Sequence, residues 1–435
     1  MNIFAAKKIH FIGIGGIGTS SIAHILIKKG KKISGSDQTP SEITKSLKLA
    51  GATVYIGHCV GNIKNPDLVV YSPAIPNSNP EMKVAKESAI PTISYPEALG
   101  QLTKEYYTIA VAGTHGKSTT TAIASLIAIR AKLDPTIVIG TKMPELNDRN
   151  YRVGKSKLLL IEACEYKRSF LKTFPNILVI TNIEPEHLDY FKTKSNYKKA
   201  FKELIKRVPR DGIIISNKSD KVVQKIIGKD PRNIAVELQE VSRQINLKPG
   251  VPGEFNKTNS MLAAKALDQL GIKHTTIEKA ISSFKGTWRR MQRKKLDGFS
   301  CQFIDDYAHH PTEIELTLNA VREKHPHDRI LCIFQPHQYS RTFLLLKQFA
   351  RSFTNVDKVV IPNIYRVRDT EEDIAKVTPQ MLVEAINKFS KSEKACFGDG
   401  LEKTADYVKD NAGSYDLIIT MGAGDISSIY RELQT

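Results

Sequence analysis

The chain has 435 residues, which is more than one ordinary domain holds and suits two or three domains. Hydrophobic residues make up 41% and charged residues 25%, as in globular proteins, and no stretch approaches the ~20 apolar residues that a membrane helix needs. The net charge of +19 would suit a nucleic-acid partner, but the basic residues are spread along the chain without interleaved aromatics. We therefore expect neither a membrane span nor a nucleic-acid partner.

The cysteines and the N-terminus indicate a cytoplasmic protein. The apolar run near the N-terminus is broken by glycines, so we expect no signal peptide. The five cysteines are too far apart to form a zinc or redox pair, which is typical of reduced thiols in a cytoplasm. They are Cys59, Cys164, Cys301, Cys332 and Cys396.

The first block, residues 1–103, is expected to be a Rossmann-like α/β domain. Strand-like runs cover residues 9–12, 32–35 and 68–72, and a helix is expected over 19–29. This β-α-β order predicts a parallel sheet with helices on its faces.

The turn after the first strand, residues 13–18, fits the pattern G-x-G-x-x-G. Its glycines let the backbone approach a pyrophosphate, and the following helix N-terminus offers unpaired N–H groups to the anion. Asp37, at the end of the second strand, would hold a ribose in a dinucleotide-binding domain. This segment alone leaves two hypotheses open, a nicotinamide-dependent oxidoreductase or a protein that holds another nucleotide diphosphate.

The second block, residues 104–287, is expected to be a P-loop-type ATPase domain with a parallel sheet. Its strand-like runs are residues 107–112, 158–161, 177–181 and 212–216, and its helices include 195–207 and 258–270.

A second glycine-rich loop follows the strand over residues 107–112. It consists of Gly113, Thr114, His115, Gly116, Lys117, Ser118 and Thr119. Two residues separate the glycines where the usual phosphate loop has four, so this is a shortened loop. We expect backbone N–H groups to bind phosphate, Lys117 to meet the terminal phosphates, and Ser118 or Thr119 to reach a magnesium ion. Two phosphate loops in one chain favour an enzyme that binds a nucleotide-linked substrate and ATP over an oxidoreductase.

Polar side chains follow two other strands of this block. Glu162 comes directly after residues 158–161, with Glu165 three residues on, and His187 lies in the run 181–189 after the next strand. Because parallel strands deliver their carboxyl ends to one edge of a sheet, we expect these side chains near the ATP loop as metal ligands.

The third block, residues 288–435, is expected to be a second Rossmann-like domain. Its strand-like runs are residues 303–307, 330–334, 358–361 and 416–420, and the last one leads into another glycine turn.

Seven runs along the chain carry a resemblance to a known family. They are HFIGIGGIG (10–18), SGSD (34–37), GTHGKSTTT (113–121), TNIEPEHLD (181–189), DDYAHHPTEI (305–314), FQPHQYSRT (334–342) and GAGDI (422–426). Together they resemble the Mur ligase family over essentially the whole chain.

The resemblance implies three domains, for a UDP-sugar, for ATP and for the incoming amino acid. It implies that the lactyl carboxylate of UDP-N-acetylmuramate takes the γ-phosphate of ATP, and that the amine of L-alanine then displaces phosphate. The implied cofactors are ATP and Mg²⁺, and the implied role is peptidoglycan precursor synthesis in the cytoplasm, as a monomer or homodimer.

The resemblance also implies roles for individual residues. Catalytic roles are expected for Lys117, His187, Asp306, His309 and Arg341. ATP-binding roles are expected for Gly113, Thr114, His115, Gly116, Lys117, Ser118, Thr119, Asn256, Asn259 and Arg289. UDP-sugar-binding roles are expected for Gly13, Gly15, Gly16, Gly18, Ser36, Asp37, Ser72 and His58. Metal ligands are expected to be Ser118, Glu162 and His187. Further candidates are Asn62, Arg290, Tyr307 and His310, and for His310 a helix-capping role is an equal alternative.

Four positions depart from the family pattern, and one of them is Phe255, which stands where histidine is common. Cys164 and Lys167 stand where acidic residues are expected, in the segment after Glu162. Phe201 stands where relatives that add later amino acids carry a carbamylated lysine. This favours the branch that adds alanine, or the branch that reattaches a recycled tripeptide, with which the pair Glu165-Tyr166 is associated.

Overall fold

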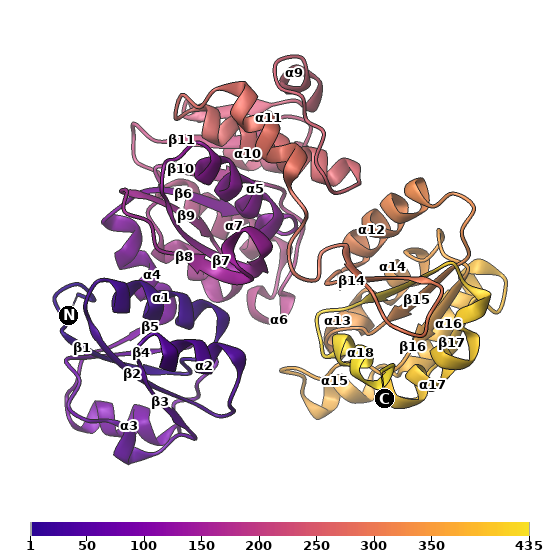
Figure 1. Ribbon diagram of the computed structural model, residues 1–435, viewed down its shortest axis with the longest axis horizontal. Helices are drawn as coiled ribbons and strands as arrows, with labels where there is room; N and C mark the ends of the chain where they lie inside the picture. Colours follow the sequence, from indigo (N-terminus) through magenta and orange to yellow (C-terminus); the bar gives the residue numbers. More distant parts are fainter. Residues whose placement is uncertain (1, 435) are drawn as a thin grey trace. The chain divides into compact units, whose positions relative to one another are not determined.

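The computed structural model describes residues 2–434, whose strands form three sheets (Figure 1). The chain divides into two compact units. One unit contains Met1–Pro249 and Lys257–Phe284, and the other contains Gly250–Asn256 and Lys285–Thr435. The first two sheets belong to the first unit, and the third sheet belongs to the second.

The first sheet is parallel throughout, in the order β3-β2-β1-β4-β5. Its strands are β1 (Lys8–Ile12), β2 (Lys32–Asp37), β3 (Thr53–Ile56), β4 (Leu68–Tyr71) and β5 (Thr92–Ser94). Its helices are α1 (Ile17–Lys28), α2 (Glu42–Leu49), η1 (Val60–Asn62), α3 (Pro80–Glu87) and α4 (Tyr95–Lys104). The central strands read as continuous apolar runs because helices cover both faces of a parallel sheet. As in Rossmann-like sheets, the strand order reverses between β1 and β4. Ligands of such sheets bind at the carboxyl ends of the strands at this point.

The second sheet has the order β12-β11-β10-β6-β9-β7-β8 and is parallel except for the pair β7–β8. Its strands are β6 (Tyr107–Ala112), β7 (Thr136–Met143), β8 (Arg149–Arg152), β9 (Leu158–Glu162), β10 (Ile177–Ile180), β11 (Ile213–Asn217) and β12 (Asn233–Val236). The helices of this block are α5 (Lys117–Arg130), η2 (Pro144–Leu146), η3 (Tyr166–Lys172), α6 (Leu188–Phe191), α7 (Lys194–Ile205), α8 (Lys221–Ile227), α9 (Leu238–Ser242), α10 (Glu254–Asp268) and α11 (His274–Ser283). The strands β9, β6 and β10 are neighbours, so the polar residues after them share one edge of the sheet.

The third sheet has the order β13-β14-β18-β15-β16-β17, and only the edge strand β13 runs antiparallel among its described pairs. Its strands are β13 (Gln292–Lys294), β14 (Gln302–Asp306), β15 (Ile330–Phe334), β16 (Lys358–Ile361), β17 (Ala395–Phe397) and β18 (Leu417–Met421). Its helices are α12 (Pro311–Lys324), α13 (Tyr339–Leu344), α14 (Leu346–Arg351), α15 (Glu371–Ala375), α16 (Pro379–Ser390), α17 (Leu401–Asn411), η4 (Ala412–Ser414), η5 (Ile426–Ser428) and α18 (Ile429–Glu432). Within the described residues, no helix is both long and apolar enough to cross a bilayer.

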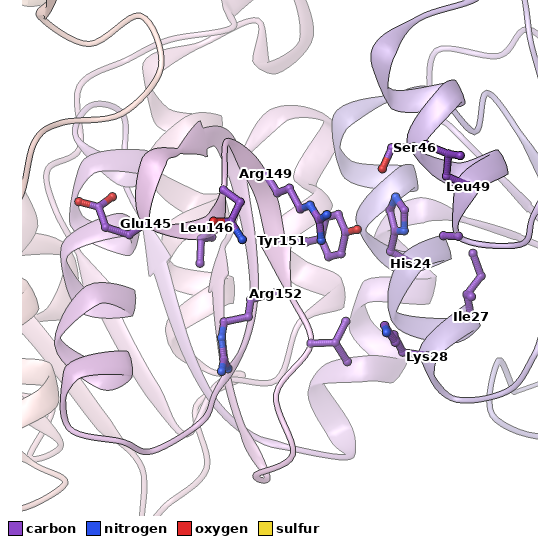
Figure 2. Close-up of a pocket in the computed structure, with 13 residues that line it drawn as sticks. His24, Ile27, Lys28, Ser46, Leu49, Glu145, Leu146, Arg149, Tyr151 and Arg152 are labelled. Atoms are coloured by element: carbon purple, nitrogen blue, oxygen red, sulfur yellow. The ribbon is translucent and has the colours of Figure 1, made fainter.

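The first two sheets are joined within their unit by α1, which contacts β7 and β8. The side-chain amide of Asn150 donates to the Ile17 carbonyl at 2.5 Å. The ring of His24 stacks on that of Tyr151, with centroids 4.3 Å apart (Figure 2). A cavity of about 790 Å³ lies at this join, lined by the ends of α1 and α2 and by the β7–β8 hairpin. The site residues expected from the sequence are not among those that line this cavity.

Candidate active site

The loop between β6 and α5 has a backbone that requires glycine at two positions. Gly113 has a φ of 145° and Gly116 a φ of 78°, in the left-handed region that other residues rarely adopt. A Cβ atom at Gly113 would collide with the Thr181 hydroxyl, and one at Gly116 would collide with the side-chain amide of Asn259. The loop therefore places its N–H groups at the N-terminus of α5, where an anion binds well.

The segment after β10 holds this loop in place. The backbone N–H of His115 donates to Asn182 Oδ1 at 2.9 Å, and Asn182 Nδ2 donates back to the His115 carbonyl at 3.0 Å. The hydroxyl of Thr114 donates to the Glu184 carbonyl at 2.7 Å and lies 2.9 Å from the hydroxyl of buried Tyr197. Protein contacts thus hold the loop in this conformation.

The ammonium of Lys117 lies across this loop. Its Nζ donates to the carbonyls of Gly113 at 2.7 Å and Thr114 at 2.9 Å, and forms an ion pair with Glu165 Oε2 at 3.0 Å. Burial acts to lower the pKa of Lys117, but the Glu165 carboxylate and its acidic neighbours outweigh burial and raise that pKa above its usual value. The side chain therefore carries a full positive charge where the loop would hold phosphate.

Ser118 and Glu162 lie together at the end of β9. The Ser118 hydroxyl donates to Glu162 Oε2 at 2.8 Å, and the same oxygen accepts from the N–H of Gly140 at 2.9 Å. Both side chains are partly exposed, as is Thr119 in the next position. The structure therefore brings two of the three expected metal ligands together.

His187, the third expected ligand, lies against two other carboxylates. Its Nε2 is 3.6 Å from Glu165 Oε1 and 3.9 Å from Glu186 Oε2, and one ligand atom from each of the three residues falls within a 4.8 Å cluster. Nε2 thus faces the two carboxylates, whereas the buried Nδ1 of the same ring has no hydrogen-bond partner. Two carboxylates and an imidazole suit a divalent cation. Glu165 was expected at this edge of the sheet, whereas Glu186, although it lies inside the run 181–189, had been given no role of its own.

The two departures after Glu162 lie on the surface of this segment. The thiol of Cys164 and the side chain of Lys167 are exposed. Lys167 has a φ of 50°, and its Nζ donates to the Pro73 carbonyl at 3.4 Å, beside Ser72. The extra lysine therefore adds a positive charge next to a residue expected to bind the UDP-sugar.

The first glycine turn is built around Asp37. The N–H of Gly15 donates to Asp37 Oδ2 at 2.8 Å, so this carboxylate supports the turn itself. Gly13 has a φ of 78°, and a Cβ there would come within 3.1 Å of Ser72. A Cβ at Gly16 would come within 2.8 Å of Thr19, and a Cβ at Gly18 would come within 2.6 Å of Tyr95.

The remaining residues expected to bind the UDP-sugar form a neighbouring group. Ser36 Oγ is 2.9 Å from His58 Nδ1, and both side chains contact the carboxylate of Glu81, as does Asn62. Sequence reasoning missed Glu81 because a single acidic residue in a turn-rich segment carries no recognisable pattern.

In the second unit, Asp306 is buried at the end of β14. Its two carboxylate oxygens accept from the N–H groups of Met291 at 2.7 Å and Ala308 at 2.9 Å. Burial raises the pKa of Asp306 to about 6, although Arg290 and these two hydrogen bonds act to lower it.

His309 and Arg341 lie in one cluster with His337. No role had been expected for His337. The rings of His309 and His337 are 5.8 Å apart, and Arg341 Nη1 is 3.2 Å from His337 Nδ1. The His337 ring also stacks on Tyr365 at 5.7 Å. His337 could have been chosen as a site residue from the sequence, since it lies inside the run 334–342 that resembles the family.

Arg289 lies inside this unit and is only 2% exposed. Its guanidinium donates to Asp305 at 3.1 Å and to the carbonyls of Gly422 and Gly424 at 2.7 and 3.1 Å. Its neighbour Arg290 is partly exposed and lies over the ring of Tyr307.

The two expected asparagines fall in different units, and His310 has a capping contact. Asn256 Nδ2 donates to the Pro252 carbonyl at 2.6 Å, whereas Asn259 Oδ1 accepts from Thr120 in the phosphate-loop unit at 3.2 Å. The ring of His310 accepts from the N–H of Thr312 at 3.4 Å and caps α12, as its alternative role predicted.

A glycine loop at a helix N-terminus, a charged lysine and carboxylates at the ends of adjacent parallel strands define an α/β protein that binds nucleotide phosphates. Family models match three consecutive segments: "Mur ligase family, catalytic domain" over residues 8–107, "Mur ligase middle domain" over 111–247 and "Mur ligase, glutamate ligase domain" over 289–424. The chain belongs to the Mur ligase family, and the prediction of three α/β domains of this family is confirmed.

Several curated relatives match nearly the whole chain. The UDP-N-acetylmuramate–L-alanine ligase of Clostridium tetani is 42% identical, covering 97% of this chain and 96% of its own. The ligase of the same name from Clostridium acetobutylicum is 39% identical over 98% and 96%.

Solved structures match over a similar share of the chain, at lower sequence identity. The UDP-N-acetylmuramate-alanine ligase MurC from Thermotoga maritima is 26% identical with a TM-score of 0.79, covering 98% of this chain and 97% of its own. A murein peptide ligase from Psychrobacter arcticus is 22% identical with a TM-score of 0.73, covering 98% of both chains, and this likeness shows the fold alone.

Proposed function

We propose that this chain is an ATP-dependent ligase that joins L-alanine to the lactyl carboxylate of UDP-N-acetylmuramate during peptidoglycan precursor synthesis. The observation that carries the proposal is the 42% identity, over 97% of the chain, to a UDP-N-acetylmuramate–L-alanine ligase. A cytoplasmic location, with the enzyme as a monomer or homodimer, fits this role. We place the domain boundaries at residues 103/104 and 287/288.

The reaction needs an activated carboxylate, because a free carboxylate is a poor electrophile. A lactyl carboxylate oxygen attacks the γ-phosphorus of ATP, ADP leaves, and an acyl phosphate forms. The amine nitrogen of alanine then attacks the acyl carbon, the C–O bond to phosphate breaks, and the amine loses a proton as the amide forms. Both partners of the first step are anions, so the site must neutralise charge.

The loop from Gly113 to Thr119 is the proposed holder of the ATP phosphates. Its N–H groups would bind phosphate oxygens, and Lys117 would turn its ammonium from the loop carbonyls to the β- and γ-phosphates. Asn259 packs directly under Gly116, so this residue would fix the loop against the nucleotide. Asn256 and Arg289 remain proposed ATP-binding residues, and the partly exposed Arg290 joins them.

Mg²⁺ is the proposed second cofactor, and it would supply charge neutralisation for the phosphates. The residues that would hold it are Ser118 and Glu162 at one position and Glu165, Glu186 and His187 at the other. The approach of His187 Nε2 to both carboxylates, with one ligand atom from each residue within 4.8 Å of the others, supports a ligand at the second position.

The third domain is proposed to carry the incoming amino acid. Asp306, His309 and Arg341 are the proposed catalytic residues there, and the guanidinium of Arg341 suits the α-carboxylate of alanine. In the first domain the glycine turn, Ser72 and the group around His58 would hold the UDP-sugar.

A second candidate function is the attachment of a recycled tripeptide to UDP-N-acetylmuramate. The pair Glu165-Tyr166 favours it, and the Tyr166 ring lies 4.8 Å from that of His187. The experiment is phosphate release by the pure protein with Mg-ATP, UDP-N-acetylmuramate and either L-alanine or the tripeptide. Release with alanine, and none without the sugar nucleotide, is the expected result. Release only with the tripeptide would favour the second candidate.

A further inference from the structure

Glu81 is a fully buried carboxylate that connects three elements of the first domain. It lies in the first turn of α3, and its Oε2 accepts from Ser36 Oγ at 2.5 Å and lies 3.3 Å from His10 Nε2. Its Oε1 accepts from Asn62 Nδ2 at 2.6 Å and from the backbone N–H of Cys59 at 3.2 Å. One carboxylate thus joins β1, β2 and the η1 segment, the last two of which carry residues expected to bind the UDP-sugar.

The charge on Glu81 sets the direction of the hydrogen bonds around it. Burial acts to raise the pKa of Glu81, but hydrogen bonds from His10, Ser36 and Asn62 lower it to about 2, so the group is an acceptor only. The single proton of the Ser36 hydroxyl then points to Glu81. At its other contact, 2.9 Å from His58 Nδ1, the Ser36 oxygen must accept.

This chain of hydrogen bonds selects the tautomer of His58. Because Ser36 accepts, Nδ1 of His58 carries a proton, and in the neutral imidazole the lone pair is on Nε2. His58 is partly exposed, whereas Glu81 is buried, so only the histidine is open to a ligand.

We propose that Glu81 is a positioning residue that acts through Ser36 to hold His58 as the Nδ1–H tautomer, so that Nε2 accepts a hydrogen bond from an N–H or O–H group of the sugar nucleotide. The identity of this ligand rests on the proposed function. The role of Glu81 goes beyond anchoring α3, because its network ends on a side chain that is partly exposed.

The substitution Glu81→Gln reverses this chain while preserving shape. Cys59 offers a backbone N–H and Asn62 an amide N–H at the Oε1 position, so the glutamine oxygen must sit there. Its NH₂ group must then face Ser36 and His10 Nε2, both of which must accept from it. Ser36 then accepts from the glutamine and donates to His58 Nδ1. The proton of His58 moves to Nε2, which can no longer accept from the ligand.

The experiment combines histidine NMR with kinetics on the full-length protein. In protein labelled with ¹⁵N-histidine, with the His58 signals assigned by their loss in His58→Ala, we expect the Nδ1–H tautomer in the unmodified enzyme and the Nε2–H tautomer in Glu81→Gln. We also expect the KM for UDP-N-acetylmuramate to rise about tenfold in Glu81→Gln, as for one lost hydrogen bond, with kcat and the KM for ATP within about twofold. Glu87→Gln, an exposed position on the same helix, is the matched control.

The outcomes separate the alternatives. A purely structural Glu81 would reduce the amount of active enzyme and thus kcat, without raising the KM for one substrate. An Nε2–H tautomer in the unmodified enzyme, or equal KM values in Glu81→Gln and Glu87→Gln, would overturn the proposal. If Glu81→Gln does not fold, the tautomer in the unmodified protein decides alone. A lack of alanine-dependent activity in the unmodified enzyme would overturn the proposed function instead, and the His58 proton would still decide the role of Glu81.

Discussion

Lys117 is held by the same loop that it is proposed to serve. Its ammonium lies on the carbonyls of Gly113 and Thr114 and pairs with the buried carboxylate of Glu165. These acceptors compensate for the desolvation of a buried charge, which would otherwise favour the neutral amine. The ammonium therefore lies charged beside the loop, from which it would turn to the phosphates.

Lys117→Ala is expected to reduce kcat by about 10²–10³-fold, because its ammonium faces the charge that develops on the transferred phosphate. Steady-state phosphate release measures the change, and circular dichroism checks that the fold persists. Lys199→Ala, an exposed position on α7, is the control and should keep normal turnover. Near-normal turnover in Lys117→Ala would show that the loop has been misinterpreted.

Glu81 should also make the stability of the protein depend on acid. Its pKa lies near 2 in the folded protein and near 4.5 in the unfolded chain, so it contributes stability that is present above about pH 5 and is lost as the pH falls through 2. Relative to the unmodified protein, Glu81→Gln should lose about 3 kcal/mol at pH 7, and the difference should shrink by about 1 kcal/mol by pH 4.

Urea unfolding at the two pH values measures this difference, with Glu87→Gln as the control. A difference between Glu81→Gln and the unmodified protein that is the same at pH 7 and pH 4 would contradict the ionised, hydrogen-bonded state of Glu81.

Sequence alone located residues whose neighbours form a pattern, such as Lys117 and Ser118 in the phosphate loop. Glu81 was not predicted because an isolated carboxylate gains its role from residues distant in sequence, whereas Glu186 lies beside His187 in a recognised run and was simply given no role of its own. The burial of Arg289 was likewise unpredictable, since two of its three acceptors are carbonyls more than 130 positions away. The roles of such residues depend on hydrogen-bond partners that only the fold brings together.

At the scale of elements, the phosphate loop depends on the segment that follows β10. Thr114 and His115 form hydrogen bonds with Asn182 and Glu184, so the ends of two neighbouring strands, β6 and β10, build one rigid site. Rigid supporting contacts keep catalytic groups in position without the cost of ordering them during binding.

Gly116→Ala is expected to raise the KM for ATP at least tenfold while changing the melting temperature little. The added Cβ would meet the Asn259 amide, and the φ of 78° would strain any other residue, so the loop must shift. Gly413→Ala is the control, because its Cβ would enter open space without a positive φ. Unchanged ATP affinity in Gly116→Ala would contradict the role of this loop.

The buried strands could be predicted, and several edge strands could not. The runs that became β1, β6, β10 and β15 are continuous and apolar because both faces of a parallel sheet are covered. β8 and β13 are short and polar, since an edge strand needs little apolar material, and their sequences resemble loops. β7 was missed although it is eight residues long, because Gly140 and polar residues interrupt its second half.

At the scale of the whole molecule, the three sheets follow the three blocks read from the sequence. The net charge of +19 is consistent with substrates that carry diphosphate and triphosphate groups. The sequence could not predict that the first two blocks pack into one compact unit, because the contacts of α1 with β7 and β8 leave no periodic signature.

The most direct test of the central claim is a competition assay with product identification. The pure enzyme receives Mg-ATP, UDP-N-acetylmuramate and equal concentrations of L-alanine and the recycled tripeptide, and mass spectrometry identifies the sugar-nucleotide product. The account predicts UDP-N-acetylmuramoyl-L-alanine with one phosphate released per product. A product that carries only the tripeptide, or no ATP-dependent product, would contradict it.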